Sequence, residues 1–217
     1  MSKKLVLTYL SIFIFLVSIN PFIMKIQADK KDKTRVINVV YDDSGSTYFD
    51  NGKTQMDIWS NSLYAIEALS ALLQSNDTMN IFQMSANEYK DKEPSKLTIK
   101  GSDSMKKRID AMEDIKIDYC NTPYRTVEIA YDDLCSRVNS MADELWLVVI
   151  TDGIFQEDDK TLKPKVVKDL KQRLEDLDSS SVNVVLLTIG NKVDGGLESK
   201  KYNYFHAKNS NCVIFIL

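Results

Sequence analysis

The sequence predicts an α/β fold built on a mostly parallel sheet, and three observations carry that prediction. Apolar runs rich in β-branched residues occur at 36–41, 145–150 and 182–189, as expected for strands that are buried on both faces. The segments between these runs carry apolar residues at steps of three and four, which is the pattern of amphipathic helices. The alternation of the two kinds of segment implies βαβ units with right-handed crossovers.

The first strand, 36–41, is followed by a long helix and two short strands. Apolar residues, Trp59 among them, recur at helical spacing and predict a helix over about 57–75. Short apolar runs at 79–84 and 97–99 predict two strands. Paired as a hairpin, these strands give the otherwise parallel sheet one antiparallel edge.

Three further helices are predicted between and after these strands. The first lies around 105–112, and Ser102 or Asp103 is available as its N-cap. The second begins at Pro123, because proline suits the first helical position, and the third begins near Pro164. The expected core-facing residues are Val127, Ala130, Leu134 and Val138 in the second helix and Val166, Leu170, Leu174 and Leu177 in the third.

The N-terminus is predicted to be separate from the domain. Two lysines precede an uncharged, strongly apolar stretch at 5–24, which is the layout of a signal peptide. As a helix, about 20 residues reach roughly 30 Å, so an uncleaved membrane anchor stays open as the alternative. We therefore expect a signal peptide or membrane anchor at 1–28, a charged linker at 29–34 and a domain at 35–217. The domain is expected to be exported, and to be extracellular or at the cell surface.

Polar side chains gather where the predicted strands end. Asp42, Ser44 and Ser46 stand on alternate residues directly after the first strand, and Asp152 follows the strand at 145–150. Thr122 stands at the start of a predicted helix. Ligands of open α/β sheets bind at the carboxyl ends of the strands, where these side chains meet. Hard oxygens that converge on one point indicate a hard divalent cation.

These segments together resemble the metal-ion-dependent adhesion site (MIDAS) of the von Willebrand factor type A family, which includes the integrin inserted domains. The matching segments are Asp42-Asp43-Ser44-Gly45-Ser46, Thr122-Pro123 and Thr151-Asp152-Gly153. The resemblance covers about residues 35–211. It implies a Rossmann-like three-layer α/β/α sandwich with helices on both faces of the sheet.

The resemblance also implies how a metal would be held. Ser44, Ser46 and Thr122 would bind Mg²⁺, or Ca²⁺ or Mn²⁺, through their hydroxyls, and Asp42 and Asp152 would act largely through bound waters. Neutral hydroxyl ligands leave the cation under-neutralised, so it attracts one more carboxylate. The implied function is a protein-binding module that grips an Asp or Glu of a partner protein through the metal.

The sequence departs from the family pattern at two places. Many members carry glycines before the threonine, whereas Cys120-Asn121 precede Thr122 here. Thr126 therefore stays open as an alternative ligand. Near the end of the chain, only 211–217 remain for the closing helix of the family, so that helix is expected to be short or truncated.

Other function classes are disfavoured. After residue 28 the chain carries 25 basic and 31 acidic residues, and no basic patch predicts nucleic-acid binding. Asp43-Ser44-Gly45 also resembles the turn of aspartic proteases, but that fold is all-β. A subtilisin-like triad needs a catalytic histidine and a serine motif, and the only histidine, His206, follows the last clear strand. We expect that the protein is not an enzyme. Of the residues in the segment 42–46, we expect Asp43 to matter least for metal binding.

One functional alternative stays open, an accessory subunit that couples a separate ATPase or membrane complex to its target. The chain has no Walker motif of its own, so such a motor would be another protein. The acidic stretch 157–159 is interpreted as a solvated loop. The cysteines lack zinc-site spacing and are interpreted as unpaired thiols, with one disulfide and an odd cysteine as the alternative; they are Cys120, Cys135 and Cys212.

Overall fold

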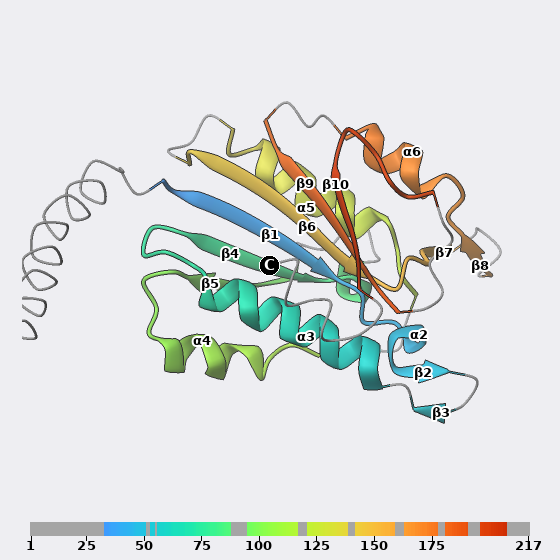
Figure 1. Ribbon diagram of the computed structural model, residues 1–217, viewed down its shortest axis with the longest axis horizontal. Coiled ribbons are helices and arrows are strands. Elements are labelled where there is room, and N and C mark those ends of the chain that lie inside the picture. The colour runs from blue at the N-terminus through green and yellow to red at the C-terminus, as the bar shows by residue number, and fades with distance from the viewer. Residues whose placement is uncertain are drawn as a thin grey trace, which may run out of the picture. The chain divides into compact units, whose positions relative to one another are not determined.

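One six-stranded sheet, in the order β10-β9-β6-β1-β4-β5, forms the centre of the fold (Figure 1). Its strands are β1 (Arg35–Tyr41), β4 (Thr78–Gln83), β5 (Lys96–Lys100), β6 (Glu144–Thr151), β9 (Asn183–Ile189) and β10 (Asn203–Ala207). All neighbouring strands pair in parallel except β4 and β5, which are antiparallel. The predicted mostly parallel sheet with one antiparallel edge is confirmed.

The computed structural model describes residues 33–50, 53–54, 56–87, 95–116, 121–138, 142–158, 163–177, 181–190 and 196–207. The predicted signal peptide or anchor at 1–28 and the predicted closing segment at 211–217 lie outside these residues. In the described ranges, no helix is both long enough and apolar enough to cross a membrane.

Helices cover both faces of the sheet and complete the predicted three layers (Figure 1). Helices α3 (Met56–Ala71) and α4 (Met105–Met112) pack on one face, and α5 (Arg125–Cys135) and α6 (Leu170–Glu175) pack on the other. In the central strand β1, Val39 faces the first pair of helices and Val40 faces the second, and both are fully buried. Burial on both faces explains the continuous apolar run of this strand.

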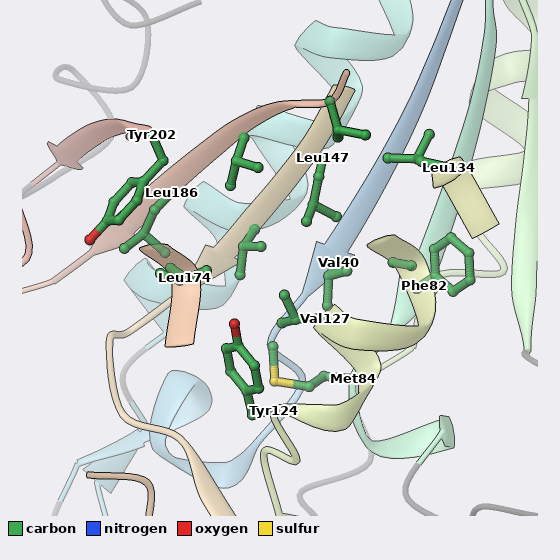
Figure 2. Packing of buried hydrophobic residues seen from close by; sticks show 14 of the residues in the cluster. Val40, Phe82, Met84, Tyr124, Val127, Leu134, Leu147, Leu174, Leu186 and Tyr202 are labelled. Atoms are coloured by element: carbon green, nitrogen blue, oxygen red, sulfur yellow. The ribbon is translucent and has the colours of Figure 1, made fainter. Parts of the chain in front are cut away.

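The core under α5 and α6 joins helix residues to alternate residues of β1, β4, β6 and β9 (Figure 2). Leu134 and Val127 of α5 pack with Val40 and Leu147, and all four are essentially inaccessible to solvent. Burying one such side chain contributes about 1.5–3 kcal/mol. This packing holds α5 against the sheet, and the residues just before α5 lie at the carboxyl edge of β1.

Short elements surround that edge. They are α2 (Gly45–Tyr48), the 3₁₀ turn η1 (Ser85–Asn87), the hairpin of β2 (Phe49–Asp50) with β3 (Lys53–Thr54), and the hairpin of β7 (Gln156–Asp158) with β8 (Pro164–Val166). The helix α2 contains the candidate ligand Ser46 and leads into the β2–β3 hairpin, β7 begins four residues after the candidate ligand Asp152, and η1 follows β4.

Two predicted elements around the second hairpin were wrong. The helix expected from Pro164 is the strand β8 over its first turn, and Val166, expected in the core, is 56% exposed. The helix α6 starts only after Asp169, whose left-handed backbone (φ 63°) interrupts any helix there. Glu157 and Asp158, expected in a loop, pair with this strand in β7. Whether two segments pair as hairpin strands depends on their tertiary contacts, which the spacing of apolar residues in the sequence does not reveal.

The helix α4 also differs from the prediction. Its N-cap is Ser104, whose hydroxyl accepts from Lys107 N, rather than Ser102 or Asp103. Met105 and Ile109 are more than half exposed, and Arg108 is buried instead. Its guanidinium donates to Ser70 O at 2.7 Å and caps the carbonyls at the end of α3. Of the apolar residues of α4, Ala111 and Met112 pack against the core, whereas Met105 and Ile109 face solvent.

The helix α5 begins at Arg125, two residues after the predicted start at Pro123, and ends before Val138, which is exposed. Three of its four predicted core residues are buried as expected. The remaining predicted elements, 57–75, 79–84, 97–99, 145–150 and 182–189, are present with ends shifted by a few residues. Such shifts at element ends are ordinary.

Candidate metal centre

Asp42 joins the ends of the two central strands. Its backbone N–H donates to Ile150 O at 2.9 Å, which ties the loop after β1 to the end of β6. Its carboxylate is fully buried and accepts from Ser44 N at 3.0 Å and from Thr151 Oγ1 at 2.9 Å. The carboxylate is therefore fixed between the two loops in which the sequence motif lies.

The two serines of the first loop present their hydroxyls together. Ser44 Oγ lies 2.9 Å from Ser46 Oγ, the former buried and the latter half-buried. Thr47 closes the turn, since its buried hydroxyl donates to Ser44 O at 2.7 Å. The alternate spacing of the serines thus brings two neutral oxygens to one point, as predicted.

Thr122 packs against the loop that follows Asp152. The hydroxyl of Thr122 donates to Ile154 O at 3.1 Å and accepts from Gln156 N at 2.8 Å. The carboxylate of Asp152 is buried and accepts from Ile154 N at 2.9 Å. A hydroxyl has two acceptor positions, so Thr122 Oγ1 keeps one for a further contact. The structure therefore brings all three predicted segments to one edge of the sheet.

Thr126, the alternative ligand, has a different position. It is fully buried in the first turn of α5, and its hydroxyl donates to Met84 O at 2.6 Å, beyond the end of β4. Thr122 contacts the Asp152 loop, and Thr126 contacts the β4 end. The geometry therefore favours Thr122 as the third hydroxyl of the centre.

The two site carboxylates oppose each other electrostatically. Burial and the negative charge of Asp152 raise the pKa of the Asp42 carboxyl to about 7, although hydrogen bonds from Ser44 and Thr151 act in the opposite direction. Two buried carboxylates at one edge are unfavourable while both are ionised. A cation between them would remove that penalty and restore the ionised form of both.

The donor set suits a hard divalent cation. It consists of two carboxylates and three hydroxyls, and Mg²⁺, Ca²⁺ and Mn²⁺ prefer oxygen ligands of this kind. Within the described residues, no three His, Cys, Asp or Glu side chains cluster as a metal site. A metal at this edge therefore depends on the hydroxyls as well as on the carboxylates.

Solved structures share this architecture. A structure of proximal thread matrix protein 1 from the mussel byssus, described with a zinc-occupied MIDAS motif, is 15% identical, with a TM-score of 0.56 over 86% of this chain and 46% of that one. A von Willebrand factor type A protein from Catenulispora acidiphila is 13% identical, with a TM-score of 0.55 over 85% and 41%. The PilB minor pilin from Streptococcus sanguinis is 15% identical, with a TM-score of 0.53 over 86% and 60%.

The chain has the von Willebrand factor type A fold. It spans less than two thirds of the length of each of these three proteins. Neither a comparison with protein families nor one with curated proteins gives a match for the sequence. Three short motifs and the strand order thus point to one fold, although the identity to these proteins is low.

Within this von Willebrand factor type A fold, sequence reasoning missed three residues that shape the centre. Thr151 lies inside the recognised motif but was given no role, and its hydroxyl holds both Asp42 and Gly153 N. Gln83 and Ser85, at the end of β4, bind the buried carboxylate of Asp43. The sequence signal that could have identified Gln83 and Ser85 is the same one that identified the other loops: polar residues at the carboxyl end of a buried strand, here β4.

Proposed function

We propose that this chain is a metal-ion-dependent protein-binding module that acts without catalysis. Its centre binds Mg²⁺, or Ca²⁺ or Mn²⁺, and the metal bridges to an Asp or Glu side chain of a partner protein. The observation that carries this proposal is the placement of two buried carboxylates, Asp42 and Asp152, with three hydroxyls at the carboxyl edge of the central strands. The zinc-occupied MIDAS motif of the mussel protein supports a divalent metal at the corresponding edge of the fold.

Each residue has a stated part in this proposal. Ser44, Ser46 and Thr122 contribute neutral hydroxyl oxygens, and Asp42 and Asp152 contribute charge through waters of the ion. Mg²⁺ keeps several of its waters in proteins and demands near-octahedral oxygens. A centre with neutral first ligands leaves the bound cation attractive to one further carboxylate, which a partner protein supplies.

The proposed setting is outside the cell or at its surface. The signal-like layout of residues 1–28 supports it, and so does the similarity in fold to a minor pilin. The same domain beside an ATPase inside the cell would instead favour the accessory-subunit alternative. Cell fractionation with an antibody against the domain separates the two settings.

Calorimetric titration of the full chain with Mg²⁺ tests the metal. The Asp42→Ala and Asp152→Ala variants should lose Mg²⁺ affinity while circular dichroism shows an unchanged fold. Asp110→Ala is the matched control, because Asp110 is an exposed carboxylate that pairs only with Lys106 on α4 among the described residues. Unchanged Mg²⁺ binding in both site variants would contradict the assignment.

A pull-down from extracellular and surface fractions tests the bridge. The partner should be retained in Mg²⁺ and released in excess EDTA. It should also be lost when the acidic residue that it presents is changed to the amide. A partner retained equally in EDTA would show that binding does not depend on the metal.

A further inference from the structure

The two halves of the proposed centre come from distant parts of the chain and need a common support. Asp42, Ser44 and Ser46 follow β1, and Thr122 precedes α5, about 80 residues later in the sequence. The loop after β1 and the start of α5 both hydrogen-bond to the segment Gln83–Ser85, at the end of β4. No residue of this segment belongs to the sequence motif.

Asp43 ties the first loop to this segment. Its carboxylate is fully buried and accepts three hydrogen bonds: from Ser85 N at 3.0 Å, Ser85 Oγ at 2.5 Å and Gln83 Nε2 at 2.8 Å. Hydrogen bonds to an ionised acceptor are about twice as strong as neutral ones. The Asp43 carboxylate is thus hydrogen-bonded to the end of β4 and the turn that follows it. Because these bonds fix the Asp43 backbone, they also fix the positions of its neighbours Asp42 and Ser44.

Thr126 ties the second loop to the same segment. Its buried hydroxyl donates to Met84 O at 2.6 Å, and Met84 N donates to Tyr41 O at 3.1 Å. The side chain of Met84 packs beside Tyr124 and Val127 (Figure 2). Hydrogen bonds fix direction and register, which apolar packing alone does not. These hydrogen bonds therefore fix the position of the start of α5, and of the nearby Thr122, relative to the ends of β1 and β4.

We infer that Asp43 and Thr126 are positioning residues of the proposed metal site, and that the segment Gln83–Ser85 between them sets the spacing of its two halves. The inference rests on the proposed function. Neither residue is a ligand: one binds the segment from the β1 loop and the other binds it from α5. Because Mg²⁺ demands near-octahedral oxygens, a small displacement of Thr122 from the serines lowers affinity.

Thr126→Val is the first test, since valine keeps the shape and removes the hydroxyl. Titration of the full chain should show Mg²⁺ affinity reduced about tenfold, the usual cost of losing a support behind a metal ligand. Thr126→Ser, which keeps the hydroxyl, should restore most of the affinity. Asp43→Asn should lower affinity in the same way, because an amide has one acceptor oxygen. Its NH₂ group must therefore face either Ser85 N or the pair of Ser85 Oγ and Gln83 Nε2, so it cannot accept all three hydrogen bonds.

Thr188→Val is the matched control. Thr188 is equally buried, and among the residues that the structure describes its hydroxyl contacts only β10, within 3.1 Å of Tyr204 Oη and His206 Nδ1. It should leave Mg²⁺ affinity within twofold of the wild type. Equal losses in Thr126→Val and Thr188→Val, or none in Thr126→Val, would overturn the inference.

Amide hydrogen exchange separates this inference from the proposed function. Gln156 N–H is bound by Thr122, so its exchange rate reports the position of the Thr122 loop without any metal. Thr126→Val should speed that exchange in EDTA more than Thr188→Val does, and equal rates would overturn the inference. A wild-type chain that binds no Mg²⁺, Ca²⁺ or Mn²⁺ would overturn the proposed function, while the exchange comparison would still decide the positioning roles.

Discussion

A buried carboxylate lies beside each end of the central strand β1, Asp77 at its start and Asp42 at its end, and the pKa values of the two are shifted in opposite directions. At its start, Asp77 accepts from Arg35 Nε at 3.1 Å and from Gln74 N at 2.7 Å. Burial alone would raise the pKa of Asp77, but the hydrogen bonds from Arg35 and Gln74 outweigh it and lower the pKa. At the other end, burial and Asp152 raise the pKa of Asp42. Two carboxylates that are both inaccessible to solvent thus differ in their neighbours: Asp77 forms an ion pair with Arg35, whereas among the described residues the partners of Asp42 are hydroxyls, backbone N–H groups and the carboxylate of Asp152.

The largest expected effect is at the ion-pair end. Asp77→Asn leaves the shape intact but removes the charge that compensates Arg35. Removing one partner of a buried pair costs 3–5 kcal/mol, and because Arg35 is partly exposed we expect about 3 kcal/mol. Urea unfolding at pH 7 measures the loss. A change below about 1 kcal/mol would mean that the two ends of β1 do not differ as argued.

The same substitution at the other end should act in the opposite way. Asp42→Asn relieves the repulsion with Asp152, so the metal-free protein should unfold at an equal or higher urea concentration than the wild type. The wild type should gain about 2.7 kcal/mol at a Mg²⁺ concentration of 100 Kd, and Asp42→Asn should lose that gain. Asp110→Asn serves as the control and should behave as wild type in both conditions. A strongly destabilised metal-free Asp42→Asn protein would refute the electrostatic contrast.

The pH dependence gives the next largest effect. A pKa raised in the folded state means that the folded protein binds more protons than the unfolded chain between about pH 4 and pH 7. Stability in EDTA should therefore fall as pH rises through this window, and Mg²⁺ affinity should rise, because the cation displaces the proton. Asp42→Asn should flatten both curves. Urea midpoints at pH 5, 6 and 7 in EDTA, and titrations at the same pH values, measure these trends.

The difference between the ends of β1 also shows how far sequence reasoning reaches. Apolar runs predicted the strands, and parallel strands must place their carboxyl ends together, so Asp42, Thr122 and Asp152 were correctly expected at one edge. The binding of a metal by these residues stays a prediction. What the sequence could not show were contacts between distant residues, because they depend on tertiary packing. Asp43 was expected to matter least for the metal, and its contact with Ser85, 42 residues away, was not visible in the sequence.

Two differences between the predicted and the observed elements have the same cause. The sequence pattern of α4 gave no role to Arg108, whose guanidinium is buried and donates to carbonyls at the end of α3, a contact that exists only once the two helices pack. The spacing from Val166 to Leu170 matched a helix, and Val166 in fact pairs with Gln156 in a hairpin. Local patterns predicted elements well where burial was continuous, and failed where a polar or exposed residue found its partner in another element.

The smallest expected effect concerns the single hydrogen bond from the Thr151 hydroxyl to the Asp42 carboxylate, at the end of β1 where the pKa is raised. Thr151→Val removes the hydroxyl that donates to Asp42 Oδ2 at 2.9 Å, so the ionised form of Asp42 loses a donor and its pKa should rise further. The cost in EDTA should be about 1 kcal/mol larger at pH 8, where Asp42 is ionised, than at pH 5, where it is protonated. Ser62→Ala removes a buried hydroxyl bond within α3 and should cost the same at both pH values. A Thr151→Val loss that does not change with pH would show that Thr151 only closes its own turn, through Gly153 N, and does not tune the charge of Asp42.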